Sequence, residues 1–377
     1  MEFEEYINAY YGGTLGISKR YGIEKAAITE TTMAEGLNTL YGAKVFSQLN
    51  TKSEVFKLLK KEPWTQSGWR VMTGRHAQTN GIAEGAALGT TDQPDLVEVK
   101  ANIAEVVTVW EVTTKAELLS ESDDGLGNLA AFLRKEHAEA HAYYIDAMLL
   151  SDSDTPSTVA GGASDFESLD RVTLSQAASV ALNGSSVTDG DMWEVGNDGI
   201  DRSGMTWADA YVSHASGSER ALTLAMLDAA ISNSLEQGVN YSDLIILTGY
   251  DTYQDIKQLM QVGSNATWNY NLAQGGGNNL NGVAGEAGLA FDSRVGSYDG
   301  IPIFLSQHVI SDADSASRLY LLDMANLAFR VAAPTTYVDS TNIAVTQTLS
   351  KDFAFLTAGN LICYKFKTQG SIRDIDA

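Results

Sequence analysis

The chain has 377 residues, enough for two domains or for one elaborate domain with a sizeable core. It carries 48 acidic against 25 basic residues, a net charge of −23, so its bulk surface is unsuited to nucleic acid, whose phosphates need Lys and Arg opposite them. The single cysteine excludes an intrachain disulfide, and no apolar run approaches the ~18 residues of a membrane-spanning helix.

The negative charge is unevenly distributed. Residues 1–75 carry ten basic and eight acidic side chains, so the rest of the chain holds all of the excess negative charge. A surface this acidic repels itself in dilute buffer, whereas at about 1 M salt the Debye length falls to ~3 Å and the repulsion is screened. The charge therefore indicates a salt-rich environment, with an ordinary acidic cytosolic protein as the alternative. The N-terminal stretch is acidic and aromatic, the reverse of a signal peptide, so we expect the chain to act where it is made.

The N-terminal region has no strong periodicity. Residues 1–52 show only short patterns, which predict an extended arm with local helical turns. Ser53 is placed to cap a short helix that Pro63 stops. Three lysines form a basic edge on this helix: Lys57, Lys60 and Lys61. The edge is either a solvated helix face or part of an arm that touches anionic nucleic acid.

A long hairpin is predicted next. One strand spans 64–75 and another spans 95–114, where β-branched residues partly alternate with polar ones. The segment between them is small, Gly-rich and nearly uncharged, as expected for a flexible tip. Because a hairpin is marginally stable in isolation, we expect this one to protrude and to lie against a second chain.

The longest predicted helix spans 122–150. Asp124 can cap its start, and at ~1.5 Å per residue the helix would be about 35–40 Å long, enough to brace a whole domain as a spine. Apolar and small side chains recur along it at spacings of three and four. They predict the buried stripe Leu126, Ala130, Leu133, His137, Ala140, Tyr144 and Met148.

The remaining sequence predicts an α/β region. Residues 151–206 are rich in Ser, Asp, Gly and Thr and form its irregular opening. The Gly/Asn-rich segment 262–300 has no secondary-structure signal, which is typical of a functional or disordered loop. Two C-terminal strands are expected to form a hairpin that turns near Gly359. The other predicted elements are helix 218–236 closed by Gly238, buried strand 244–247, helix 250–261, and strands 301–306, 318–323 and 326–333.

Two histidines lie four residues apart on one face of the spine helix. His137 and His141 could chelate a transition metal, and Glu136 and Glu139 are close to them. The metalloprotease pattern needs Glu directly after the first His, and Ala138 occupies that position. Both histidines are also near the apolar stripe. We therefore expect a structural role for them, with a bound metal as the alternative.

No catalytic constellation is found elsewhere. The pairs Asp152/Asp154, Asp189/Asp191 and Asp198/Asp201 could bind Ca²⁺ or Mg²⁺, although clusters of acids arise by chance in so acidic a chain. The glycines at 275–277 lack the Lys and Ser/Thr of a phosphate-binding loop, and no G-x-S-x-G elbow is present. We predict no catalytic, cofactor-binding or metal-binding residues, no cofactor, and no enzymatic activity.

The order of these elements resembles that of the major capsid proteins of tailed viruses, whose fold is named after phage Hong Kong 97. Nearly the whole chain is covered, and three local signatures carry the likeness. They are the helix–strand–helix run 219–260, the strand with its Gly-Ile-Pro-Ile sequence at Asp299–Ser306, and the segment RLYLLDMANLAFRV at 318–331.

The resemblance implies an α+β fold with an N-terminal arm, an extended β-hairpin loop, a peripheral domain around the spine helix and an α/β axial domain. The implied boundaries are 1–63 for the arm, 64–114 for the extended loop, 115–154 and 334–377 for the peripheral domain, and 155–333 for the axial domain. It also implies self-assembly into pentamers and hexamers of an icosahedral shell that encloses double-stranded DNA. The virion, assembled in the host cytoplasm without a membrane, would then be its location, with portal, scaffolding and decoration proteins as further partners.

Two features depart from the family pattern. Some relatives cross-link their shells through a lysine on the extended loop, but no lysine lies between Lys61 and Lys100. Some carry a removable, charged N-terminal scaffolding region, which this sequence does not show, so we expect a separate scaffold or none. Together with the acidity, the resemblance indicates a virus of halophilic archaea. The alternatives are an encapsulin-like protein compartment and a metal-dependent hydrolase that uses His137 and His141.

Overall fold

The computed structural model describes residues 27–28, 55–74, 84, 93–120, 129–151, 165–183, 188–195, 198–262, 294–310, 317–340 and 350–376. The chain divides into two compact units, and the division falls inside helix α5 (Leu129–Leu149) and strands β13 (Leu327–Ser340) and β14 (Ser350–Cys363). No described helix is long and apolar enough to cross a membrane. Unit 1 comprises Met1–Ser53, Glu105–Ile145 and Ala333–Ala358; unit 2 comprises Glu54–Ala104, Asp146–Ala332 and Gly359–Ala377.

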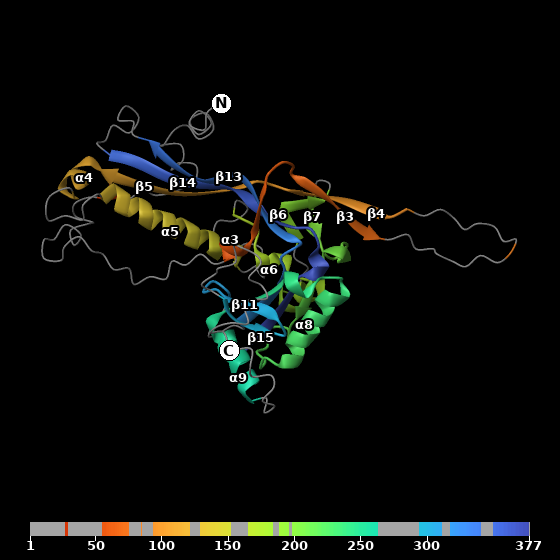
Figure 1. Cartoon of the computed structure of the whole chain (residues 1–377). Helices are drawn as coiled ribbons and strands as arrows, with labels where there is room; N and C mark the ends of the chain where they lie inside the picture. The colour runs from red at the N-terminus through yellow and green to blue at the C-terminus, as the bar shows by residue number, and fades with distance from the viewer. Residues whose placement is uncertain are drawn as a thin grey trace. The chain divides into compact units, whose positions relative to one another are not determined.

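Unit 1 is a helix packed on a sheet. Strand β5 (Ala104–Thr113) lies beside β14, and β14 lies beside β13, in a five-stranded sheet. The outer strands of this sheet are β1 (Ala27–Ile28) and β2 (Lys60–Pro63), and β2 belongs to unit 2. Helix α4 (Thr114–Ser120) follows β5, and α5 runs along β5 and β14 (Figure 1). The core between helix and sheet consists of Trp110, Val112, Ala116, Leu129, Leu133, Phe353 and Phe355.

The spine helix is confirmed over Leu129–Leu149, but its predicted stripe is only partly correct: Leu133 is buried and His137 packs on Trp110, whereas Tyr144 is not buried. The predicted cap Asp124 and the first stripe residue Leu126 lie outside the described residues. Tyr144 is 56% exposed. The stripe was misplaced because Ala130 and Ala140 carry too little apolar surface to decide which face is buried. Asp146 is also buried, and five of the buried side chains recur at multiples of four residues: Leu129, Leu133, His141, Ile145 and Leu149.

The strand predicted over 95–114 is two strands in two different sheets. Strand β4 (Asp95–Ala101) pairs with β3 (Gly68–Gly74), whereas β5 begins at Ala104 in the five-stranded sheet. The break falls at Asn102 and Ile103, where the Asn360 side-chain amide donates to the Asn102 carbonyl oxygen at 2.9 Å. A local sequence pattern cannot reveal this break, because its partner lies 258 residues away.

The predicted hairpin is confirmed at its base by the antiparallel register of β3 and β4. Its tip, 75–92, falls outside the described residues except for residue 84. Residues 151–206, expected to be irregular, contain β6 (Thr188–Val195) and β7 (Asp198–Asp201), which extend the hairpin into a four-stranded sheet of order β3-β4-β6-β7. The hairpin base therefore pairs with a strand of its own chain.

Unit 2 also contains a six-stranded sheet of order β10-β11-β9-β12-β15-β8. The sheet packs against helices α8 (Leu224–Glu236) and α9 (Tyr250–Val262), which share one apolar core with it (Figure 1). The strands are β8 (Tyr211–Ser213), β9 (Leu244–Thr248), β10 (Arg294–Tyr298), β11 (Ile301–Leu305), β12 (Ser317–Asp323) and β15 (Gly370–Ile375).

The sequence predicted most of this sheet. The fully buried β9, the helix α9 and the strands β11 and β12 are confirmed, as is the close of α8 at Gly238 with φ of 82°. Helix α8, however, starts at Leu224 rather than 218. The reason is that Arg220 exchanges backbone hydrogen bonds of 2.9 Å with Asp374 and Asp376 beside β15, which holds the preceding residues in an extended form.

Part of the segment expected to lack structure is a hairpin. Strand β10 occupies Arg294–Tyr298 and turns into β11 through Asp299 and Gly300, whose φ values are 46° and 83°. An Asp-Gly pair with two positive φ values is the favoured two-residue hairpin turn. The preceding residues 263–293 lie outside the described ones.

The C-terminal hairpin at Gly359 is absent from the described residues, because β14 runs straight through that position. A Cβ at Gly359 would collide with the carbonyl oxygen of Arg330 and lie 2.7 Å from the Phe329 ring. The glycine therefore marks a close approach of β13 rather than a turn. Strand β13 likewise continues past Pro334. Only Ala328–Val331 of β13 pair with β2, and Pro334 lies beyond them. The N–H group that proline lacks is therefore not needed for a hydrogen bond to β2.

The last strand was not predicted. We expected 334–377 to return to the peripheral domain, but β15 pairs with β12 and β8 in the six-stranded sheet of unit 2. The register between β15 and β12 is irregular at Asp374, whose φ is 60°. Because of this irregularity, Ile372 and Ile375 both face the α8/α9 core. The end of the chain is thus a structural member of the sheet.

A buried ionic cluster occupies the opposite face of this sheet. The Asp170 carboxylate, on helix α6 (Leu169–Val172), accepts from Arg318 at 2.8 Å and from Arg373 at 2.9 Å. The Tyr320 hydroxyl donates to it at 2.9 Å. Asp170 is fully buried, and the two arginines are 7% and 1% exposed. We call these four residues the Asp170 cluster; it fixes α6 to β12 and β15.

We expect Asp170→Asn to lower the free energy of unfolding by about 3–5 kcal/mol, because it removes the carboxylate charge that pairs with two buried guanidinium groups. Denaturant unfolding monitored by circular dichroism measures the change. The control is Glu98→Gln, which breaks the exposed 3.0 Å pair with Arg70 and should cost less than about 1 kcal/mol. Equal effects of the two substitutions would contradict the role given to the cluster.

Candidate functional site

The two histidines of the spine helix are built into unit 1. His141 is 1% exposed, and its Nδ1 and Nε2 lie 2.8 Å from the hydroxyl oxygens of Thr108 and Thr357. Thr108 belongs to β5 and Thr357 to β14, so the imidazole joins both strands to α5. One ring nitrogen donates and the other accepts, which occupies both positions at which a metal would bind.

His137 stacks on an aromatic side chain one turn earlier. Its ring lies 4.6 Å from that of Trp110 at an interplanar angle of 15°. Trp110 also contacts Tyr337, Phe353 and Phe355, and the Arg134 guanidinium lies 4.0 Å from the centre of the Tyr337 ring. Burial lowers the pKa of His137. These contacts place both imidazoles in the packing between α5 and the sheet.

No group of three or more His, Cys, Asp or Glu side chains that could hold a metal ion is found among the described residues, and the predicted acidic pairs fall outside this finding. Asp152 and Asp154 lie outside that part. The pair Asp189/Asp191 is on β6 and the pair Asp198/Asp201 is on β7, two strands that are antiparallel neighbours. Their side chains are not described.

Two of the three lysines of the expected basic edge bind groups of their own chain. The predicted helix is a single turn, α3 (Val55–Leu58), and Lys60 and Lys61 lie on β2. The Lys61 ammonium donates to the carbonyl oxygens of Phe56 and Leu59, and burial lowers its pKa to about 8. Lys60 pairs with Glu62 at 3.0 Å. Only Lys57 of the three keeps an exposed head without such a partner.

The start of α3 is capped from a distant element. Ser53, the predicted cap, lies outside the described residues. The carboxylate of Asp146, fully buried near the end of α5, accepts from the backbone N–H groups of Val55 at 3.2 Å and Phe56 at 2.7 Å. Nothing in the local sequence signals this cap, because its two halves are 90 residues apart.

One face of the β3–β4 hairpin is an exposed apolar surface. Met72 lies opposite Leu96 in the register, and the two side chains are 54% and 60% exposed. Arg70 lies opposite Glu98 on the same face and forms an ion pair of 3.0 Å with it. We call these four residues the hairpin face. A large exposed apolar pair rimmed by charges is typical of an interaction surface.

The other face of the hairpin base is fixed. Trp69 is buried, its ring lies edge-on to that of Tyr364 at 6.2 Å, and the Arg330 guanidinium lies 5.8 Å from it. Arg330 also donates to the carbonyl oxygen of Gln66 at 2.7 Å, just before β3. The base is therefore held while the hairpin face remains open. In addition, β3 is an end strand of its sheet, and the described residues place no strand on its outer side.

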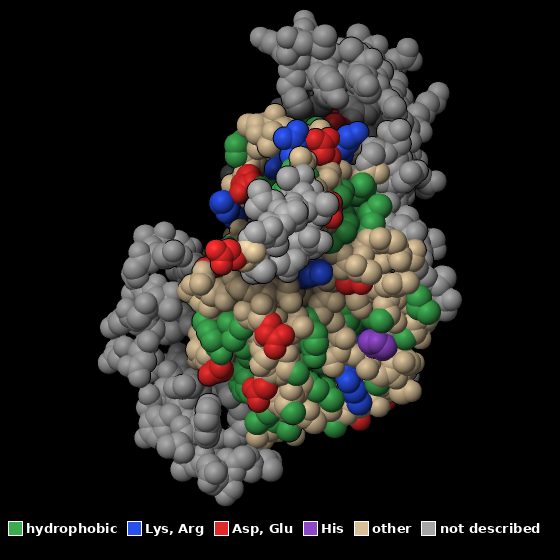
Figure 2. All heavy atoms as spheres, turned by 90° about the vertical axis from the view of Figure 1, so that its right-hand side faces the viewer, with side chains coloured by type: hydrophobic (Ala, Val, Ile, Leu, Met, Phe, Trp, Pro, Cys, Tyr) green, Lys and Arg blue, Asp and Glu red, His purple; other side chains and the backbone are tan. Residues whose placement is uncertain are grey.

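Sequence reasoning predicted the hairpin but not this face. The signal was present, because alternation along a strand places Arg70 with Met72 and Leu96 with Glu98 on common sides. The register between the strands, which brings the two pairs together, depends on the turn and could not be read from the sequence. The space-filling view shows hydrophobic, acidic and basic side chains side by side on one surface, with the acidic ones scattered over it (Figure 2).

No protein-family model matches this chain, and no curated protein matches its sequence. Solved structures do match it. The chain of the cyanophage A-1(L) capsid asymmetric unit is 15% identical with a TM-score of 0.63, and the match covers 89% of this chain and 96% of that one. The capsid of the native GTA particle is 12% identical with a TM-score of 0.56, covering 97% and 98%. A Mycobacterium phage Bobi chain is 12% identical with a TM-score of 0.54, covering 93% and 100%.

These likenesses show the fold. The chain has the mixed α+β fold of Hong Kong 97-like capsid proteins over most of its length. The fold class predicted from the sequence is confirmed.

His141 makes stability depend on pH. Burial lowers the pKa of its imidazole from 6.5 to about 4, so the unfolded chain takes up this proton before the folded chain does. Its contribution of roughly 3 kcal/mol is complete above pH ~6.5 and is lost as the pH falls toward 4. We expect His141→Gln to flatten the pH dependence of the free energy of unfolding in that range.

The matched control is His214→Gln, which removes a partly exposed imidazole, so that the difference between the two variants reports the buried position of His141. Some slope will remain in His141→Gln because burial lowers the pKa of His137 and His308 as well. If the free energy of unfolding depends on pH in the same way for the wild type and His141→Gln between pH 4 and 6.5, the idea that the buried His141 imidazole is neutral is refuted.

Proposed function

We propose that this chain is a major capsid protein that assembles into pentamers and hexamers of an icosahedral shell enclosing double-stranded DNA. The observation that carries the proposal is the likeness to the cyanophage A-1(L) capsid chain, which spans 89% of this chain and 96% of that one. The chain would act in the virion of a tailed virus, after assembly in the host cytoplasm. Portal, scaffolding and decoration proteins would be its other partners.

The hairpin supports this role. Its base is anchored by Trp69 and Arg330, and its open face presents Met72 and Leu96 to solvent. A second copy of the chain that covers this face would bury apolar surface that one copy leaves exposed. Contacts between two different patches of identical chains are head to tail, and such contacts close into rings.

The contacts between copies would be non-covalent. No lysine lies between Lys61 and Lys100, so the hairpin tip has no amine for an isopeptide cross-link. The only thiol, Cys363, is buried, and burial raises its pKa to about 12. A thiolate is needed for disulfide exchange, so this residue is inert at neutral pH. Shell strength would therefore depend on buried area and charge.

The test is assembly of the purified full-length chain at molar salt. We expect rings or closed shells by electron microscopy and particles far larger than 40.4 kDa by light scattering. Particles isolated from infected cells should hold nuclease-protected DNA. A co-purifying enzyme without DNA would favour the encapsulin-like compartment instead, and a monomer under all conditions would refute both. Metal bound by the wild type but lost in His141→Ala would favour the hydrolase.

The hairpin face has its own variants in this assay. Met72→Ser with Leu96→Ser should raise the concentration needed for assembly about tenfold or more, since each lost apolar contact is worth about 1–2 kcal/mol. Leu118→Ser, which alters a side chain 66% exposed on α4, is the matched control and should assemble normally. If the two variants need the same concentration for assembly, the hairpin face is not part of the interface between copies.

We propose a salt-rich habitat for the virus, as for viruses of halophilic archaea. The support for this part is the net charge of −23. Particles should loosen on dilution from about 1 M to ~0.1 M salt, because screening between acidic surfaces is lost as the Debye length grows from ~3 to ~10 Å. Light scattering during stepwise dialysis measures this. Particles unchanged by desalting would refute the salt-rich habitat and leave the capsid role intact.

A further inference from the structure

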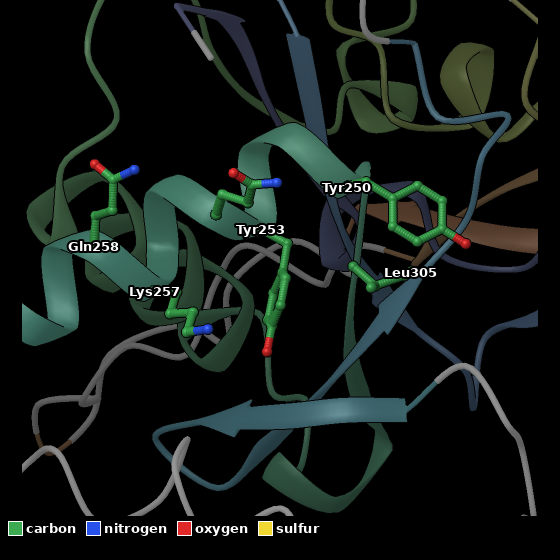
Figure 3. A pocket seen from close by; sticks show the side chains of 6 residues that line it. Tyr250, Tyr253, Lys257, Gln258 and Leu305 are labelled. Carbon is green, nitrogen blue, oxygen red and sulfur yellow. The ribbon is translucent and has the colours of Figure 1, made fainter.

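A pocket lies between α9 and β11 in unit 2. It has a volume of about 470 Å³ and is lined by Tyr250, Tyr253, Gln254, Lys257, Gln258 and Leu305. Figure 3 shows Tyr253 and Lys257 pointing to the same side of α9, and Tyr250 beside Leu305 of β11. Leu305 pairs with Thr248 of the parallel strand β9, so the pocket lies at the carboxyl ends of both strands, where α/β sheets commonly bind ligands.

The chemistry of this pocket suits a carboxylate. Lys257 is the only lysine between residues 136 and 350. Its side chain is exposed, and no described carboxylate forms an ion pair with it. The neighbouring Gln254 and Gln258 are exposed and carry amide N–H donors. The Gln258 amide points to the other side of α9 from Lys257 (Figure 3). An exposed cation that lines a pocket, in a chain with 48 acidic residues, favours an acidic occupant.

An acidic patch lies at the other end of β11. The Tyr241 hydroxyl donates to Asp299 at 3.1 Å, and the Tyr298 hydroxyl donates to Asp228 at 2.6 Å. Both carboxyl side chains belong to exposed residues, and no described Lys or Arg forms an ion pair with either. The pKa of Tyr241 is raised by its hydrogen bond to Asp299 and also by the charge of Asp228, as expected for two carboxylates close together. We call these four residues the acidic turn.

The pocket and the acidic turn are held apart by one strand. Asp299 and Leu305 are separated by six residues, about 20 Å at ~3.3 Å per residue. Two complementary patches at opposite ends of a rigid element cannot meet within one copy. A contact between the pocket of one copy and the acidic turn of another would be heterologous, and a heterologous contact forms a ring when its rotation closes.

We propose that the pocket at Lys257 receives the acidic turn of a second copy of this chain. The Lys257 ammonium then pairs with the carboxylate of Asp228 or Asp299 of the next copy around the ring. The inference rests on the proposed function, because it supplies one specific contact for the assembly of this chain.

Charge reversal tests the contact. Assembly of the full-length chain is followed by sedimentation velocity and electron microscopy. We expect Lys257→Glu alone and Asp228→Lys alone each to raise the concentration needed for assembly about tenfold, the effect of losing roughly 1.4 kcal/mol per contact. The double variant should assemble within about threefold of the wild type. Lys367→Glu, an equal charge change on an exposed residue outside the pocket, is the control and should assemble normally.

Mixing the two single variants gives a sharper test. In a ring that alternates Lys257→Glu and Asp228→Lys copies, each contact joins either two reversed charges or two native ones. Only a ring with an even number of copies can alternate throughout, so the mixture should form six-membered but not five-membered rings. The double variant, which reverses every contact, should form both.

The outcomes separate the two proposals. A wild type that never forms rings would overturn the proposed function and this contact with it. Wild-type rings with unchanged assembly of Lys257→Glu would overturn the contact and leave the function standing. If the single variants lose assembly and the double variant does not restore it, the acidic turn is excluded as the occupant of the pocket. This conclusion requires that Asp228→Lys keeps the wild-type melting temperature. If it does not, a variant that combines Asp228→Asn with Asp299→Asn replaces it, and undiminished assembly of that variant would overturn the contact.

Discussion

The Asp170 cluster is the interaction on which the architecture of unit 2 depends. One carboxylate binds two guanidinium groups and a phenol from β12 and β15, and all four side chains are nearly inaccessible to solvent. Burying such charges is costly unless every one of them is paired and hydrogen-bonded. The cluster therefore admits one register only, since a shift of β12 by one residue would carry Arg318 and Tyr320 to the opposite face, among the α8/α9 core.

Other buried acids have a different kind of partner. Asp146 accepts from the backbone N–H groups that start α3, and Asp374 accepts from those of Ala215 and Gly217 at 2.5 and 3.2 Å. Asp323 does the same for Ala325 at 3.1 Å. Backbone N–H donors satisfy a carboxylate as well as a cation does in these places. In a chain with almost twice as many acids as bases, backbone N–H groups thus supply part of the hydrogen bonding of these carboxylates at loops and helix ends.

The sequence predicted those parts of the fold that local patterns decide. The continuous apolar run of β9, the amphipathic α9 and the Gly238 helix end needed no distant partner to be recognised. Several of the failures involve distant contacts. Gly359 was taken for a turn because its close neighbours Arg330 and Phe329 are unknown to the sequence, and β15 was missed because its partner strand lies about fifty residues earlier. For the candidate surfaces, the sequence supplied the residue types of the hairpin face and of the acidic turn, but not the register or the turn geometry that groups them.

The hairpin joins a fixed base to an open face, and this combination has a physical consequence for association. Three residues of β4, Val99–Ala101, pair with β6, and Arg330 holds the chain just before β3, so the direction of the hairpin is set within its own copy. Association costs free energy in lost freedom, and ordering a flexible loop at the interface adds to that cost. A hairpin that is already oriented avoids part of it. Weak contacts, such as one apolar pair and one ion pair, then suffice when they are repeated around a ring. Non-covalent assembly becomes feasible for a chain whose hairpin tip has no lysine for cross-linking and whose cysteine is buried.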